Sequence, residues 1–217
     1  MNASKERKFV WWSHGANATR STAYFFRKCF PDFWNYEDNH LTQWERPTHS
    51  FLIPKGCEDF VITTNVRNPY TLIVSQYRDL VDQAVIEGKN ILDFKDWVFT
   101  ESIDTLDLCD TIRWNLTGSV PEHFIHMESL EDDLVKLPFV QTWLKEDSTN
   151  YVILEEALDA SIRKNVFKGE SIADRYVNGF QDISGIYDQD TANQVVRLFS
   201  GEHYFNKIGY DIDSWKS

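Results

Sequence analysis

The stretch Asp59–Leu80 reads DFVITTNVRNPYTLIVSQYRDL and changes its hydrophobic period part-way along. Its first half contains the apolar, β-branched run Phe60–Thr64, which is typical of a buried strand. Pro69 suits the first turn of a helix, where its missing N–H costs nothing. Apolar residues then follow the spacing of an amphipathic helix: Tyr70, Ile73, Val74, Tyr77, Leu80, Val81, Ala84 and Val85. The stretch therefore predicts a strand that passes directly into a helix.

Arg67 lies at this crossing, and Ser75 lies about two turns into the predicted helix. In open α/β sheets, ligands bind at the carboxyl ends of strands. A guanidinium fork matches a phosphate, and a serine hydroxyl adds one more donor. The alternative is that Arg67 pairs with a nearby carboxylate and Ser75 faces solvent, because position in a fold does not establish function.

A second strand–loop–helix pattern begins at the apolar run Lys8–Trp12. Small and polar residues form the loop Ser13–Arg20, and a helix is predicted to begin near Ser21 and Thr22. This architecture favours anion binding by backbone N–H groups and by the positive end of the helix dipole. The loop lacks the G-x-x-x-x-G-K-[ST] pattern of a P-loop, so an ordinary turn with helix caps is the alternative.

Further elements follow along the chain. His123–Glu128 alternates like a strand, and Leu137–Leu144 reads as a helix before a polar break at 145–150. Short helices are predicted at Asn90–Val98 and Asp107–Leu116, and another within Ile186–Trp215. Together these elements predict one α/β domain over residues 1–217, with a central, mostly parallel sheet flanked by helices.

Composition narrows the class of protein. The 217 residues carry a formal net charge of −12, which argues against nucleic acid or an anionic membrane as the main ligand. No run of 18 apolar residues and no signal peptide is seen, so we expect a soluble, cytoplasmic protein. The three cysteines are scattered and odd in number, which predicts reduced thiols and no metal cluster.

The segment Arg67-Asn68-Pro69-Tyr70, followed by Ser75 and Tyr77, resembles the 3′-phosphate-binding motif of sulfotransferases that use 3′-phosphoadenosine 5′-phosphosulfate (PAPS). The resemblance implies that Arg67 and Ser75 hold the 3′-phosphate of PAPS. It also implies that the N-terminal loop binds the 5′-phosphosulfate through Gly15, Ala16, Asn17, Ala18, Thr19, Arg20, Ser21 and Thr22. The family usually has a lysine in this loop. Here no lysine is present, and Arg20 or His14 is expected to take its catalytic role.

Other pieces resemble the family in the expected order over residues 8–212. His49, 18 residues before Arg67, occupies about the place of the catalytic base in the carbohydrate-type branch, with His40 and Glu45 as reserves. The basic run containing Arg163, Lys164 and Lys168 resembles the cofactor lid, and Arg113 and Trp114 fall near the acceptor cleft. Glu128–Leu134 and Tyr204–Asp211 resemble the family's strand-ending and closing segments.

The resemblance thus implies a P-loop-like nucleotide-binding sulfotransferase fold. The expected reaction moves a sulfuryl group from PAPS to a hydroxyl of a carbohydrate or other small polar acceptor, releasing adenosine 3′,5′-bisphosphate. Two alternatives are a nucleotide-dependent kinase, for which the Walker lysine and a Mg²⁺-binding aspartate are missing, and a non-catalytic nucleotide-binding protein.

Overall fold

The computed structural model describes residues 2–12, 19–35, 53, 56–100, 121–165, 183, 185–199 and 201–216, with only the backbone given at 2, 19, 20, 34, 35 and 160–165. The chain divides into two compact units. The first consists of Met1–Val66 and Asp110–Val166, and the second of Arg67–Cys109 and Phe167–Ser217.

The first unit contains a five-stranded sheet with the order β3-β1-β2-β4-β5. The strands are β1 (Asn2–Ser4), β2 (Phe9–Trp12), β3 (Trp34–Asn35), β4 (Val61–Val66) and β5 (His123–His126). β4 pairs in parallel with β2 on one side and β5 on the other, whereas β1 is antiparallel to both β2 and β3. The α/β class is confirmed, and the sheet is parallel where β2, β4 and β5 pair.

The parallel register brings the carboxyl ends of three strands to one edge. Trp12 pairs with Thr64, and Val66 pairs with His126. Threonines occur in this buried sheet because their hydroxyls find backbone acceptors: Thr64 Oγ1 donates to the Trp12 carbonyl at 2.9 Å. The carboxyl ends of β2, β4 and β5 therefore share one edge of the sheet.

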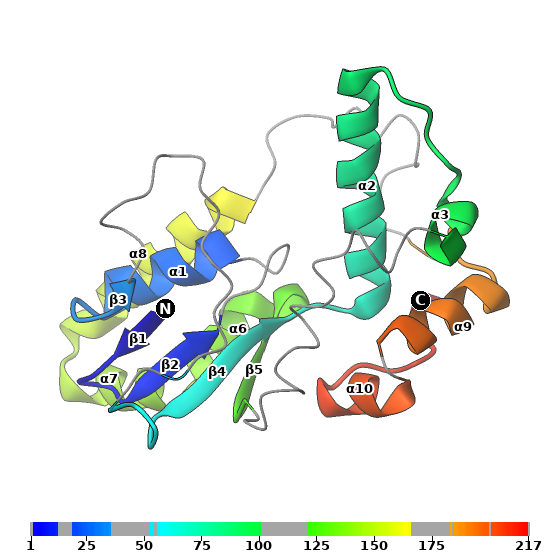
Figure 1. Cartoon of the computed structure of the whole chain (residues 1–217). Helices are drawn as coiled ribbons and strands as arrows, with labels where there is room; N and C mark the ends of the chain where they lie inside the picture. The colour runs from blue at the N-terminus through cyan, green and yellow to red at the C-terminus, as the bar shows by residue number, and fades with distance from the viewer. Residues whose placement is uncertain are drawn as a thin grey trace. The chain divides into compact units, whose positions relative to one another are not determined.

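Helices cover the sheet face that carries Phe9 and Trp11. They are α1 (Thr19–Cys29), the short η1 (Met127–Ser129), α6 (Leu130–Lys136), α7 (Pro138–Glu146) and α8 (Thr149–Asn165). The ring of Phe9 stacks on Phe139 of α7 with 4.0 Å between centroids, and it also contacts Phe26 of α1. α1 and α8 pack side by side (Figure 1). Val10 and Trp12, on the opposite face of β2, are also completely buried.

Some boundaries differ from the sequence predictions. α1 begins at Thr19, two residues before the predicted start, and β5 ends at His126, where a 3₁₀ turn takes over. The predicted break at 145–150 is shorter, because α8 starts at Thr149, whose N–H donates to the Asp147 side chain. α8 itself was not predicted, since its apolar stripe is narrow.

The second unit is built on α2 (Pro69–Glu87), which carries an N-cap at Asn68 and a left-handed C-cap at Gly88. The other elements are α3 (Phe94–Thr100), α9 (Gln189–Leu198), α10 (Glu202–Lys207) and η3 (Ser214–Lys216). The predicted apolar stripe of α2 is buried at Tyr70, Ile73, Val74, Tyr77, Val81 and Ala84, while Leu80 and Val85 are half-buried. α3 is shifted toward the C-terminus from the predicted Asn90–Val98.

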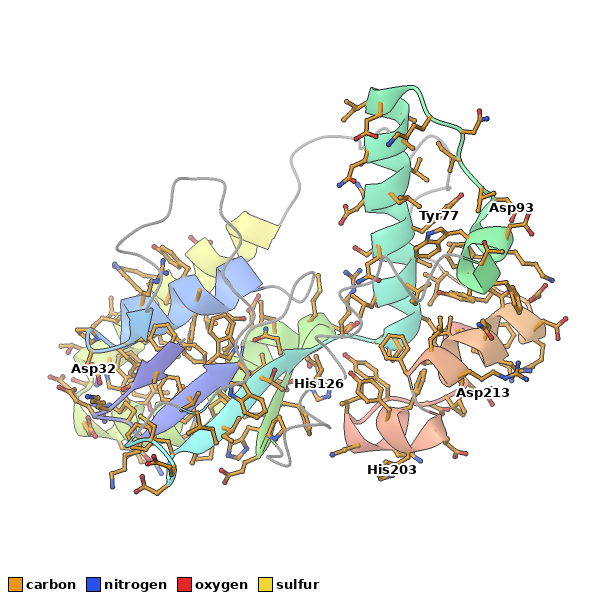
Figure 2. All side chains as sticks on the ribbon, viewed as in Figure 1. Asp32, Tyr77, Asp93, His126, His203 and Asp213 are labelled. Atoms are coloured by element: carbon orange, nitrogen blue, oxygen red, sulfur yellow. The ribbon has the colours of Figure 1, made fainter. Side chains whose placement is uncertain are left out.

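Aromatic contacts hold the second unit together. The ring of Tyr77 packs against Phe94 and Trp97 of α3, with centroids 5.3 Å apart in each case (Figure 2). Tyr187 contacts Tyr70 ring to ring and donates its hydroxyl hydrogen to the Tyr70 carbonyl at 2.8 Å. The contacts of Tyr187 with Tyr70 fix the first turn of α2, which begins two residues after Arg67.

Candidate functional site

A small pocket lies within the second unit along α2. It is lined by Arg67, Thr71, Val74, Ser75, Arg78 and Ile183, and its volume is about 40 Å³. A single water needs roughly 10–15 Å³ of such space, so there is room for on the order of three oxygen-sized atoms. The structure therefore brings Arg67 and Ser75, which are eight positions apart in the chain, to one pocket.

Helix periodicity explains the lining. Thr71, Ser75 and Arg78 lie at i, i+4 and i+7 on α2, so they form one stripe along its surface. All three are half-buried, and the stripe borders the buried apolar face at Val74. Thr71 and Arg78 were assigned no role from sequence, although the helical spacing from Ser75 points to both.

Arg67 is oriented by a short chain of hydrogen bonds. Its Nε donates to Thr71 Oγ1 at 3.1 Å, and Thr71 Oγ1 donates to the Asn68 carbonyl at 3.0 Å. Nε–H is one of five guanidinium donors, and the other four lie on the two Nη atoms. The bond to Thr71 therefore fixes one edge of the guanidinium plane relative to the start of α2.

Asn68 secures the backbone from which Arg67 projects. Its Oδ1 accepts a hydrogen bond from the Tyr70 N–H at 3.0 Å, and its Nδ2 donates to Ser214 Oγ at 2.9 Å. The hydroxyl of Tyr70 donates to the Ile212 carbonyl at 2.6 Å. The C-terminal residues Ile212 and Ser214 thus hold the first turn of α2 in place through hydrogen bonds.

The electrostatics of the pocket favour an anion. Two arginines line it, and none of its lining residues is acidic within the described part of the chain. Burial raises the pKa of Tyr187 well above its ordinary value, Tyr70 raises it further, and the charge of Arg67 opposes the shift. Tyr187 therefore stays neutral near Arg67 and does not cancel its charge.

A second cavity, of about 230 Å³, lies in the first unit beside β5 and α6. Among its lining residues are His126 and Asp133, whose Nδ1 and Oδ2 atoms are 2.6 Å apart (His126 is labelled in Figure 2). Asp133 Oδ2 also accepts from the His126 N–H at 2.9 Å and from Ser129 Oγ at 3.1 Å. Burial acts to raise the pKa of Asp133, but these hydrogen bonds outweigh it and hold the pKa below its ordinary value.

The Asp133 carboxylate is therefore an acceptor that fixes the orientation of the His126 ring at the carboxyl end of β5. Neither residue was assigned a chemical role from sequence, because the acidic run Glu128–Asp133 is typical of a solvated helix start. A histidine ending a strand, with an aspartate seven positions on at the start of a helix, is the signal that marks this pair.

The N-terminal loop lies largely outside the described residues. This holds for His14, Gly15, Ala16, Asn17 and Ala18, and for the side chains of Thr19 and Arg20, whose backbone opens α1. Ser21 and Thr22 are completely buried. Thr22 Oγ1 accepts from Asn65 Nδ2 at 2.7 Å, and Asn65 Oδ1 accepts from Trp11 Nε1 at 2.6 Å. The part of Ser21 and Thr22 in cofactor binding stays a prediction, and the hydrogen bond of Thr22 joins α1 to β4 and, through Asn65, to β2.

The remaining predicted site residues also lie outside the described part of the chain. They are His49 with its reserves His40 and Glu45, the acceptor-side Arg113 and Trp114, and the lid residue Lys168. Arg163 and Lys164 are in the last turns of α8, with side chains that are not described. Their roles stay predictions.

No family model, curated protein or solved structure matches the chain. Within the residues that the structure describes, no helix is both long and apolar enough to cross a membrane. The same residues contain no group of three or more acidic, histidine or cysteine side chains arranged to hold a metal ion.

Proposed function

We propose that this protein is a PAPS-dependent sulfotransferase with a P-loop-like fold, and that the pocket on α2 binds the 3′-phosphate of PAPS. The observation that carries the proposal is that Arg67 and Ser75 line one pocket, together with a second arginine. The strand–turn–helix around Arg67 supports it, because β4 pairs in parallel on both sides and ends at Val66, just before Arg67, and α2 begins at Pro69.

In the proposed reaction, an acceptor hydroxyl oxygen attacks the sulfur atom of PAPS in line with the bond that breaks. The S–O bond to the 5′-phosphate is cleaved, and adenosine 3′,5′-bisphosphate leaves with the bonding electron pair. A base, for which His49 is the candidate, takes the proton of the acceptor hydroxyl. Arg20 or His14, in the N-terminal loop, stabilises the negative charge that develops on the leaving oxygen.

The α2 pocket contributes at a distance from the reacting atoms. A 3′-phosphate takes no part in bond making or breaking, so its binding free energy serves to position the phosphosulfate. The two arginines supply charge-assisted donors for this purpose, and the Ser75 hydroxyl supplies a neutral donor.

Replacing Arg67 tests the assignment of the pocket. Arg67→Ala is expected to reduce the affinity for adenosine 3′,5′-bisphosphate by about tenfold or more, because it removes a charged partner of the 3′-phosphate. The affinity for adenosine 5′-phosphate, which lacks that group, should change little. Titration calorimetry of the full chain measures both values.

Arg197→Ala is the matched control, since Arg197 is exposed on α9 of the same unit. It should leave both affinities unchanged. Equal weakening of the two nucleotides by Arg67→Ala would remove Arg67 from the proposed role.

Transfer of ³⁵S from labelled PAPS to a panel of sugars and small alcohols tests the enzyme assignment. The loop without a lysine favours one alternative, a nucleotide-binding protein without catalytic activity. Tight binding of adenosine 3′,5′-bisphosphate with no transfer to any acceptor would support that alternative. Preferential binding of ATP would favour a kinase.

A further inference from the structure

The geometry of the α2 pocket points to two more residues in phosphate recognition: Arg78 as a second guanidinium ligand, and Thr71 as the residue that positions Arg67. Together they make the pocket selective for a doubly charged phosphate monoester. This inference rests on the proposed function, because it concerns the same pocket and the same 3′-phosphate.

Arg78 is placed by the helix itself. It lies three positions after Ser75, so both side chains project from neighbouring points on one face of α2. Both line the pocket that Arg67 enters from the start of the helix. An anion in this pocket therefore lies between two arginines. Arg67 precedes the first turn of α2, and Arg78 lies further along the same helix.

Two arginines discriminate by ligand charge. Arginine stays protonated at all ordinary pH values, so both positive charges are permanent. A phosphate monoester gains its second negative charge near pH 6, and its Coulomb attraction to each guanidinium then doubles. Carboxylates, sulfate esters and phosphodiesters carry a single negative charge, so their Coulomb attraction to the two guanidinium groups does not increase in this way.

Thr71 acts through Arg67. Its hydroxyl accepts from Arg67 Nε and donates to the Asn68 carbonyl, so it links the guanidinium to the N-cap of α2. With Nε held in this way, the guanidinium plane has one orientation relative to the helix. Valine has the shape of threonine but cannot accept this bond, whereas serine can. Thr71 is thus a positioning residue.

Ionisable groups other than the two arginines also lie near the pocket. Tyr187, close to Arg67, has its pKa raised well above the ordinary value by burial. On α2 the nearest acidic residues are Asp79 and Asp82. Of the six histidines in the chain, His203 alone belongs to the second unit, where it lies exposed on α10. His203→Gln is therefore the control for protein titration.

The experiment measures the affinities of adenosine 3′,5′-bisphosphate and adenosine 5′-phosphate at pH 5.5 and 7.5, using calorimetry of the full chain. Both nucleotides carry a 5′-phosphate, so the ratio of the two affinities isolates the 3′-phosphate. In the wild type this preference should rise several-fold between pH 5.5 and 7.5, as the monoester becomes a dianion. His203→Gln should show the same rise.

Arg78→Gln should lower the preference by about tenfold at pH 7.5 and flatten its pH dependence. Arg78→Lys, which keeps the charge but not the planar fork, should retain the pH dependence with weaker binding. Thr71→Val should lower the preference, and Thr71→Ser should restore it. The melting temperature of each ligand-free variant reports on folding.

The outcomes separate the two proposals. A wild type that binds both nucleotides equally would overturn the proposed function and this inference with it. A second result is that the wild type prefers the bisphosphate as expected while Arg78→Gln shows the same preference for it at both pH values. That result would overturn the role of Arg78 alone. A Thr71→Val variant with wild-type preference, or a Thr71→Ser variant without it, would overturn the positioning role.

Discussion

Asp133 concentrates three hydrogen bonds on one carboxylate oxygen: from the His126 ring, the His126 N–H and the Ser129 hydroxyl. All three stabilise the ionised form, and its side chain is only 17% exposed. The lowered pKa of Asp133 makes this cluster a source of pH-dependent stability in the first unit.

Asp133→Asn is expected to lower the free energy of unfolding at pH 7 by about 1–3 kcal/mol, the usual contribution of hydrogen bonds to a charged group. Because the folded-state pKa is lowered, this stabilisation is present above the unfolded pKa of 3.8 and is lost as the pH falls through the folded value. The difference between variant and wild type should therefore shrink from pH 7 to pH 3, as measured by urea unfolding.

Asp132→Asn, at the exposed neighbouring position, is the matched control and should have little effect. Equal destabilisation by the two substitutions, or a difference for Asp133→Asn that does not change with pH, would contradict the account of this cluster.

Single residues differ in how far the sequence reveals them. The resemblance to the 3′-phosphate-binding motif singled out Arg67 and Ser75 as a pair, whereas the strand-to-helix change of period alone places both near one helix end without assigning them a role. Arg78 and Thr71 carry the same helical spacing, yet arginine and threonine on a helix surface are usually solvated, so the pattern alone did not single them out. The pairing of His126 with Asp133 depends on the turn that η1 makes between β5 and α6, and no hydrophobic period encodes that turn.

At the scale of elements, the capping residue Asn68 holds the N-terminus of α2, next to the pocket residue Arg67. Asn68 caps the helix through Oδ1 and contacts Ser214 through Nδ2. These two bonds are separable by substitution, because aspartate keeps the capping oxygen and loses the amide donor.

Asn68→Ala is expected to reduce stability by about 1 kcal/mol, the usual cost of losing such a cap. Asn68→Asp should lose less, since its carboxylate still caps the helix and also favours the helix dipole. Thermal unfolding measures both, and Ser214→Ala shows how much the contact with the C-terminal segment contributes. If Asn68→Asp is as unstable as Asn68→Ala, the capping role is wrong.

Short apolar runs made β2 and β4 predictable, and helical spacing of apolar residues made α2 and α7 predictable. The short strands β1 and β3 were not predictable, because two or three residues carry no period and pair only when a neighbouring strand is present. α8 was missed because Leu154 and Ala157, the buried apolar residues in its described part, form a narrow stripe among charged residues, so tertiary packing rather than sequence pattern reveals it.

At the scale of the whole molecule, the chain alternates between its two units. Each unit is assembled from two separate segments, so neither is a continuous fragment that can be expressed alone. The α/β class followed from the order of strands and helices. The single domain expected from length stays a prediction, because chain length limits domain number without fixing it.

The net charge of −12 is opposite to the charge of the pocket. A local pair of arginines can still select an anion, because charges beyond about 8 Å are largely screened at physiological salt. Binding to the full chain should therefore be measured at about 0.15 M salt, which is close to physiological ionic strength.

The central claim is that the α2 pocket recognises a 3′-phosphate. The most direct test is calorimetric titration of the wild-type chain with adenosine 3′,5′-bisphosphate and, separately, with adenosine 5′-phosphate at pH 7.5. A doubly charged group held by two arginines predicts at least about tenfold tighter binding of the bisphosphate. Equal affinities, or no binding of either nucleotide, would contradict the claim.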